Sequence, residues 1–256
     1  RAGLPDGVLN VVTGRGAVTG EALGMSMDVD VLAFTGSGPV GRRLLDYSAR
    51  SNLKRVYLEL GGKSPNIVFA DAPDLGKAAQ VSVNGIFRNS GQVCVAGSRL
   101  LVEKSIHAEF SARMVELAGR MRVGDPLDLQ TQAGAVTSDV QLAKNLSHVE
   151  TALAEGARLL GGGKRILQET GGFYMQPTVL EATPSMSIAR EEVFGPVLTV
   201  IPFETEAEAL QIANGTEYGL ASAVWTGNLA RAHRMIRGLK AGVVHVNTYG
   251  GTDITV

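Results

Sequence analysis

Residues 30–60, DVLAFTGSGPVGRRLLDYSARSNLKRVYLEL, decide the fold class of this chain. Two short apolar runs, at 30–34 and 55–60, have the length and the turn-rich flanks that predict β-strands. Between them, apolar residues recur at helical spacing and predict a helix over 39–51. A strand, a helix and a second strand in this order form a βαβ unit, in which the two strands run parallel.

The same alternation continues on both sides of this stretch. Helices of about ten or more residues separate most of the other expected strands, which lie at 7–14, 66–70, 99–104, 175–182, 196–203, 221–225 and 242–247. This pattern predicts an α/β fold with a mostly parallel sheet, because such helices cover both faces of the sheet. The sequence GGKSP at 61–65 interrupts the pattern and predicts a boundary between two domains, 1–61 and 62–256.

The composition of the chain excludes several classes of function. The chain has 256 residues, of which 45% are hydrophobic and 19% are charged, as is usual for a globular protein. Its 24 basic and 25 acidic residues nearly cancel, so there is no basic footprint for nucleic acid or for an anionic membrane. The apolar runs are too short to cross a bilayer.

The single cysteine of the chain excludes an internal disulfide framework and favours a cytoplasmic location. The four histidines have no ligand spacing, so we expect no metal.

A glycine motif, Gly36-x-Gly38-x-x-Gly41, follows the first strand of the βαβ unit and opens its helix. This is the context of a dinucleotide fingerprint, in which glycines and free helix N–H groups receive a pyrophosphate. The fingerprint also needs an acid about 20 residues later, and Glu59 ends the next strand. Glu59 is therefore a candidate ribose ligand. The two glycines that follow it allow a second interpretation, a carboxylate that points into a cleft, and a solvated surface glutamate is the third.

The only cysteine, Cys94, lies in RNSGQVCVAGSR at 88–99. A lone cysteine is most often a small buried hydrophobe. The small polar neighbours of Cys94 favour a different interpretation, a reactive sulfur that a substrate can reach.

Four stretches together resemble the aldehyde dehydrogenase superfamily: FTGSGPVG (34–41), LELGGKSP (58–65), FRNSGQVCVAGSR (87–99) and REEVFGPVL (190–198). Their order and spacing match, and the similarity covers essentially the whole chain. The resemblance implies oxidation of a small-molecule aldehyde to a carboxylic acid with NAD or NADP, NAD being favoured. It also implies that 1–61 is the C-terminal half of a Rossmann-like dinucleotide-binding domain. Residues 62–256 would be an α/β catalytic domain truncated at its end.

The resemblance also implies roles for individual residues. Cys94 is the expected nucleophile, which forms a thiohemiacetal and then, after hydride transfer, a thioester. Glu59 is the expected base for the water that hydrolyses this thioester. The expected cofactor-binding residues form the pyrophosphate loop, the adenine contact and the nicotinamide-ribose contacts: Gly36, Ser37, Val40, Gly41, Leu60, Gln141, Glu192 and Phe194. Gly38 is not required in this family. Lys63 is expected to be structural or a local electrostatic influence.

The family's usual chain is roughly twice as long as this one, so we expect a fragment. An oxyanion-hole asparagine and an adenosine-ribose lysine would precede Arg1, and an oligomerisation strand would follow Val256. The full-length protein is expected to be a homodimer or homotetramer. Asp253 makes an aminoaldehyde, such as γ-aminobutyraldehyde or its glutamylated form, a candidate substrate; its alternative role is to form a turn.

Two other interpretations stay open, and a third is excluded. A CoA-acylating member of the family would pass the acyl group to CoA, and Glu59 argues against it because that transfer needs no water-activating base. A catalytically silent truncated copy is a second alternative, and the intact Cys94, Glu59 and Glu192 argue only against degeneration. A thiolase-like enzyme would need a second cysteine, which this chain does not have.

Overall fold

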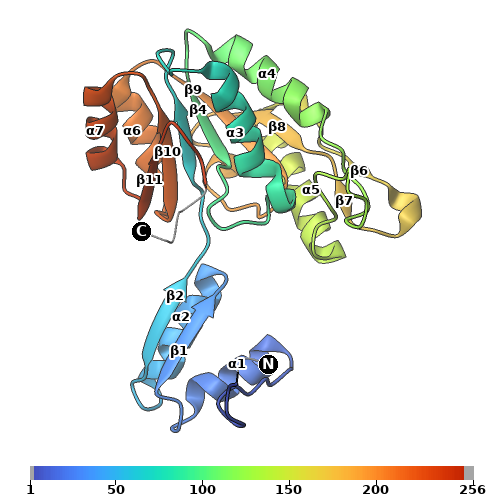
Figure 1. Ribbon diagram of the computed structural model, residues 1–256, viewed down its shortest axis with the longest axis vertical. Helices are drawn as coiled ribbons and strands as arrows, with labels where there is room; N and C mark the ends of the chain where they lie inside the picture. The colour runs from blue at the N-terminus through green and yellow to red at the C-terminus, as the bar shows by residue number, and fades with distance from the viewer. Residues whose placement is uncertain (1–2, 251–256) are drawn as a thin grey trace. The chain divides into compact units, whose positions relative to one another are not determined.

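The computed structural model describes residues 3–250. They form two compact units with a boundary between Gly61 and Gly62. Each unit is an α/β arrangement in its own right (Figure 1).

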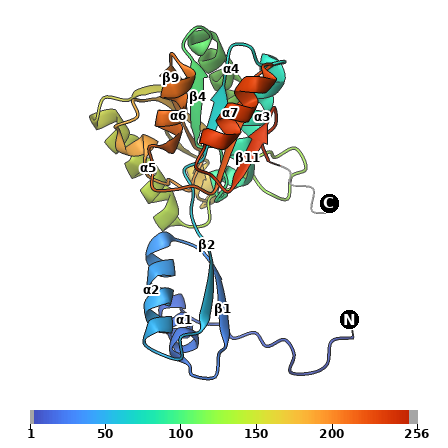
Figure 2. The same ribbon diagram turned by 90° about the vertical axis from the view of Figure 1, so that its left-hand side faces the viewer.

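The first unit, residues 3–61, is built around the βαβ stretch. Its elements are α1 (Gly16–Met25), β1 (Val31–Thr35), α2 (Gly38–Ala49) and β2 (Arg55–Glu59). Strands β1 and β2 are parallel, and α2 lies along one face of the pair (Figure 2). Helix α1 packs on α2 at Gly24, where a Cβ atom would lie 2.7 Å from the Tyr47 ring. The small residue therefore brings the two helices into close contact.

One expected strand, at 7–14, is wrong. These residues have no strand geometry, and Val11 is 81% exposed. A β-branched run becomes a strand only where a neighbouring strand and a packed face stabilise it. Within residues 3–61 the only two strands pair with each other.

The second unit, residues 62–250, contains a seven-stranded sheet in the order β11-β10-β3-β4-β9-β8-β5. Every neighbouring pair is parallel except β5 with β8, which confirms the predicted α/β fold with a mostly parallel sheet. The strands are β3 (Pro65–Val68), β4 (Arg99–Glu103), β5 (Arg158–Gly161), β8 (Thr178–Glu181), β9 (Val197–Phe203), β10 (Ala221–Trp225) and β11 (Val243–Val246). A separate antiparallel pair joins β6 (Arg165–Ile166) to β7 (Tyr174–Met175).

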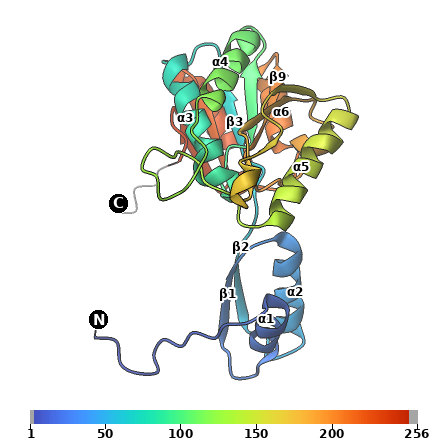
Figure 3. The ribbon, with the colours of Figure 1, turned by 90° about the vertical axis from the view of Figure 1, so that its right-hand side faces the viewer.

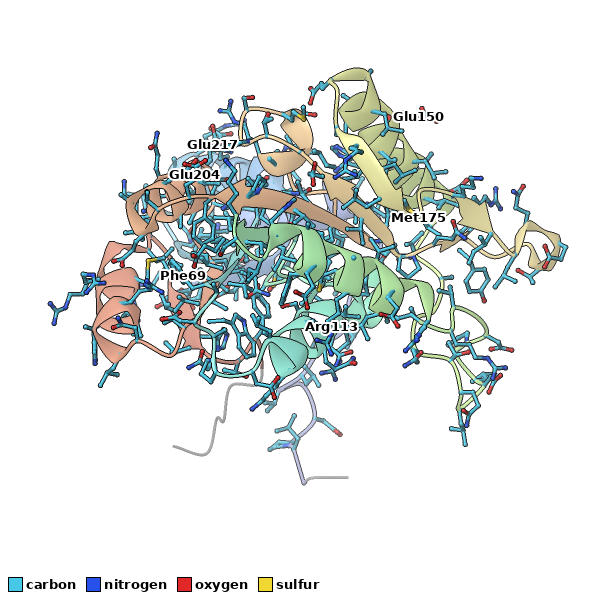
Figure 4. The ribbon with its side chains drawn as sticks, turned by 90° about the horizontal axis from the view of Figure 1, so that it is seen from above. Phe69, Arg113, Glu150, Met175, Glu204 and Glu217 are labelled. Atoms are coloured by element: carbon cyan, nitrogen blue, oxygen red, sulfur yellow. The ribbon has the colours of Figure 1, made fainter. Side chains whose placement is uncertain are left out.

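Helices cover both faces of this sheet (Figure 3). They are α3 (Leu75–Phe87), α4 (His107–Gly119), α5 (Asp139–Ala154), α6 (Glu206–Asn214) and α7 (Leu229–Gly238), with 3₁₀ turns η1 (Arg88–Gly91), η2 (Gln168–Thr170) and η3 (Ser187–Ala189). Successive side chains of β4 point to opposite faces of the sheet. Leu100 packs in the apolar cluster under α3 and α4, and Leu101 packs in the apolar cluster under α6 and α7. Phe69, labelled in Figure 4, belongs to the second cluster. Among the described residues, no helix is both long and apolar enough to cross a membrane.

Candidate active site

Cys94 lies in the loop between η1 and β4, at the end of the sheet where β4 begins. It is a free, half-buried cysteine. The three residues at 89–91 all have left-handed backbone conformations, with φ of 52° at Asn89, 54° at Ser90 and 70° at Gly91. Two non-glycine residues in this conformation are costly and persist only where the surroundings fix them.

Neighbouring segments supply that support. The Ser90 hydroxyl donates to the Gly134 carbonyl at 2.7 Å, and the Gln92 side chain accepts the Thr137 N–H at 2.8 Å. Gly91 passes so close to the backbone of Gly195 that an added Cβ would lie 2.0 Å from its carbonyl oxygen. The loop that carries Cys94 is therefore held by contacts from two other parts of the unit.

Gly62 brings a further backbone segment against Cys94. A Cβ atom at Gly62 would lie 2.2 Å from the Cys94 carbonyl oxygen, so only glycine fits this approach. The N–H of Gly62 donates to Oε1 of Glu192 at 2.9 Å. Gly62 and Glu192 also line one narrow hollow together with Val93 and Phe194. The structure thus places Glu192 and Phe194 in the surroundings of Cys94.

Gln141 joins the same group through the backbone on either side of Phe194. Its amide nitrogen donates to the carbonyls of Val193 at 2.9 Å and Phe194 at 3.2 Å. Gln141 occupies the first turn of α5, where Ser138 caps its N–H at 3.1 Å. Phe194 has a φ of 55° and is 37% exposed. The side chain of Gln141 therefore supports a left-handed residue whose ring remains accessible.

The remaining predicted site residues belong to the first unit. The Gly36 N–H donates to the Glu59 carbonyl at 3.0 Å, which ties the glycine loop to the end of β2. An added Cβ at Gly41 would lie 2.9 Å from Leu60. Ser37 is the N-cap of α2, and its hydroxyl makes no capping hydrogen bond. The first unit therefore contains six of the predicted site residues, Gly36, Ser37, Val40, Gly41, Glu59 and Leu60. The second unit contains the other four, Cys94, Gln141, Glu192 and Phe194.

Two other expectations concern residues around this site. Asp253 lies outside the described residues. Within 3–250, no group of three or more His, Cys, Asp or Glu side chains is arranged to hold a metal ion.

The sequence did not indicate the burial of Lys63, whose side chain is 1% exposed and whose Nζ atom has no hydrogen-bond partner among residues 3–250. The pKa of Lys63 is lowered to about 7, chiefly by burial and also by the cation of Arg99, while Glu192 and Glu191 act in the opposite direction. Arg99 itself donates to the carbonyls of Lys63, Ile212 and Ala213 at 2.7–2.9 Å. The guanidinium therefore joins the Lys63 segment to the C-terminal end of α6. No local sequence pattern signals this burial.

Lys63 gives a prediction about stability. Below pH 7 the amine is charged in both the folded and unfolded states, so the full cost of burying a cation lowers the free energy of unfolding. Between pH 7 and 10.5 the unfolded state binds more protons than the folded state, so this cost falls as the pH rises. Each unit of pKa difference corresponds to about 1.4 kcal/mol. We therefore expect Lys63→Met to be more stable than the parent at pH 7, by an amount that shrinks toward pH 10.

Urea unfolding of both proteins between pH 6.5 and 10, which covers most of the window between the two pKa values, measures this difference. Lys77→Met, at an exposed lysine of α3, is the matched control and should show no such dependence. A stability advantage of Lys63→Met that is constant with pH would contradict the prediction.

The fold and the site now define a class: an α/β protein with a glycine-containing loop between a strand and a helix in one unit and a half-buried free thiol in the other. Residues 1–256 match the aldehyde dehydrogenase family along their whole length. The chain belongs to the aldehyde dehydrogenase family, which confirms the resemblance carried by the four motifs.

Individual relatives are similar over the whole chain. The NADP/NAD-dependent aldehyde dehydrogenase PuuC of Escherichia coli (strain K12) is 50% identical over 256 residues, which are 100% of this chain and 51% of that protein. A crystal structure of indole-3-acetaldehyde dehydrogenase complexed with NAD+ has a TM-score of 0.97 and 53% identity, over 99% of this chain and 51% of that one. A γ-glutamyl-γ-aminobutyraldehyde dehydrogenase from Burkholderia cenocepacia J2315 has a TM-score of 0.95 and 51% identity, over 98% and 50% of the two chains. The chain thus spans about half the length of these relatives.

Proposed function

We propose that the protein carrying this chain oxidises a small-molecule aldehyde to a carboxylic acid and transfers the hydride to NAD or NADP. The observation that carries this proposal is the half-buried Cys94 in a loop fixed by Gly62, Gly91 and Gly195. A thiol that is fixed in place and reachable by a substrate is suited to covalent catalysis. In this proposal, residues 3–61 are part of the cofactor-binding domain, and residues 62–250 form most of the catalytic domain.

The proposed reaction begins at the sulfur of Cys94. The thiolate attacks the aldehyde carbon and forms a thiohemiacetal, whose oxygen the Cys94 N–H helps to stabilise. NAD or NADP, held by the residues named below, would supply the hydride acceptor for this carbon, so that a thioester would remain on Cys94. Water then attacks the thioester, so that the acyl group leaves as a carboxylic acid and the thiol is regenerated. The aldehyde is oxidised by two electrons, and the cofactor is reduced by the same two.

Glu59 is the proposed base for the attacking water. It is exposed at the end of β2, and its carboxylate has no hydrogen-bond or ion-pair partner among residues 3–250. An unpaired carboxylate is free to accept a proton from water. The end of a strand is also a position from which side chains commonly enter ligand sites in α/β folds.

The cofactor residues fit the proposed ligand. The uncapped first turn of α2, preceded by Gly36 and Ser37, leaves N–H groups that suit a pyrophosphate. Val40 is half-buried in that turn and is the proposed adenine contact, and Gly41 packs closely against Leu60.

For the nicotinamide ribose we propose Glu192, with Gln141 and Phe194 beside it. The Gly62 N–H contacts only Oε1 of Glu192. Its Oε2 has no partner among the described residues, so that oxygen can accept ribose hydroxyl groups.

Substrate, assembly and location belong to the same proposal. Relatives above 50% identity include one named for indole-3-acetaldehyde and one named for γ-glutamyl-γ-aminobutyraldehyde. This supports an aldehyde substrate in general and keeps an aminoaldehyde as the first compound to test. The family resemblance supports a homodimer or homotetramer as the proposed assembly. The single cysteine supports the cytoplasm as the proposed location.

A kinetic assay of the full-length protein tests this function. We expect aldehyde-dependent formation of reduced cofactor with γ-aminobutyraldehyde, its glutamylated form and indole-3-acetaldehyde compared in parallel, each with NAD and with NADP. The acid should form without CoA. Product formation that requires CoA would favour the acylating alternative, and no cofactor reduction with any aldehyde would contradict the proposal.

A further inference from the structure

Tyr249 is a buried tyrosine outside every motif discussed so far. It follows β11 and is 9% exposed. Its ring occupies a slot made by two glycines from different segments. An added Cβ would lie 2.8 Å from the ring at Gly85, in α3, and 2.9 Å from it at Gly97, just before β4. The absence of side chains at these two positions is what makes room for the ring.

The hydroxyl of Tyr249 reaches the residue next to Cys94. It donates to the carbonyl of Val95 at 2.7 Å across 154 positions of sequence. Burial raises the pKa of this hydroxyl above its ordinary value, so it remains a protonated donor at the pH at which enzymes work. The Val95–Ala96 peptide, the second peptide after Cys94, is thus fixed by a donor that does not titrate there.

The two carbonyls of the Cys94–Val95 segment are therefore constrained from different sides. The Cys94 carbonyl lies against Gly62, and the Val95 carbonyl accepts the hydrogen bond from Tyr249. The Cys94 carbonyl belongs to the Cys94–Val95 peptide and the Val95 carbonyl to the Val95–Ala96 peptide, so both planar peptides that follow Cys94 are held. Catalysis by a positioned nucleophile is sensitive to displacements of about 1 Å, which can cost about 100-fold in rate.

We propose that Tyr249 is a positioning residue for Cys94: its hydroxyl anchors the Val95–Ala96 peptide, and this anchor, together with the contact of the Cys94 carbonyl with Gly62, limits the positions that the thiol can take. This inference rests on the proposed function of Cys94. Tyr249 does not touch the substrate in this role and acts through the backbone of the loop.

Tyr249→Phe in the full-length protein tests the proposal, because it removes the hydroxyl and leaves the ring between the two glycines. We expect the rate of the pre-steady-state burst of reduced cofactor to fall about tenfold, with the KM for the cofactor unchanged. The rate constant for alkylation of Cys94 by iodoacetamide, followed on the 88–99 peptide by mass spectrometry, should change about threefold or more. Tyr174→Phe is the matched control, since Tyr174 is also 9% exposed but belongs to β7, and it should alter neither rate.

Alkylation requires no turnover, so it separates this inference from the proposed function. If Tyr249→Phe alkylates and turns over like Tyr174→Phe, the positioning role is overturned, whatever reaction the protein catalyses. If Cys94→Ser keeps full turnover, the proposed function fails first, and a burst effect of Tyr249→Phe can no longer be ascribed to the thiol.

Discussion

Replacing Cys94 with serine should lower aldehyde oxidation by the full-length protein by at least about a thousandfold. A serine hydroxyl is far less acidic than a thiol, so at neutral pH it supplies almost no anion to attack the aldehyde. The substitution changes one atom of a half-buried side chain, so the backbone contacts of Cys94 with Gly62 and of Gly91 with Gly195 should remain. The loss should therefore appear in kcat, and steady-state assays of cofactor reduction measure it.

Two controls accompany this experiment. Binding of NAD to Cys94→Ser, followed by isothermal titration calorimetry, should match the parent, since no proposed cofactor ligand is changed. The thermal unfolding midpoint should also match. Turnover of Cys94→Ser within about tenfold of the parent would rule out the covalent mechanism, because a nucleophile cannot be lost at so small a cost.

Replacing Glu59 with glutamine should block a later step of the same reaction. The amide cannot accept a proton from water, so hydrolysis of the thioester should slow by about 100-fold or more. Formation of the thioester should continue, since Glu59 has no role in the attack of the thiol. Rapid mixing of the variant with aldehyde and NAD should therefore give a burst close to one reduced cofactor per site, followed by a slow steady state.

Glu21→Gln provides the matched control. Glu21 is the other glutamate of residues 3–61 and lies exposed in α1. This variant should show the steady-state rate of the parent. A Glu59→Gln protein without a burst, or with unchanged steady-state turnover, would remove Glu59 from the deacylation step.

Local sequence signals predicted most elements of the fold. Helix α2 (Gly38–Ala49) matches the helix predicted over 39–51 to within two residues at each end. At the first turns of helices α3 and α6, the side chains of Asp74 and Thr205 accept backbone N–H groups. Such caps and periodicities are contained in the segment itself, so the sequence displays them directly.

The strands that the sequence predicted wrongly are those whose formation depends on pairing with distant segments. Strand β5 (Arg158–Gly161) is an antiparallel edge strand, and its side chains show no alternation of buried and exposed residues. The expected strand at 7–14 has the residue types of a strand but no pairing partner within residues 3–61. Strand formation depends on such pairing more than on residue type.

The candidate site shows the same division. Its motifs pointed to Cys94, Glu59 and Glu192 because those residues stand in short, recognisable stretches. The contacts of the site join positions that are far apart in the chain. Gly62 and Glu192, which share a hydrogen bond, are separated by 130 residues, and Tyr249 and Val95 are separated by 154. No window of sequence contains both partners of either contact, so these contacts had to come from the fold.

The loop around Cys94 is built chiefly from main-chain surfaces, at Gly62, Gly91 and Gly195. Such surfaces are the same whatever amino acid stands next to them, provided that the glycines stay. Exchanging the side chains that flank the sulfur therefore leaves these main-chain contacts in place. The path of the loop tolerates variation in its side chains but not at these three glycines.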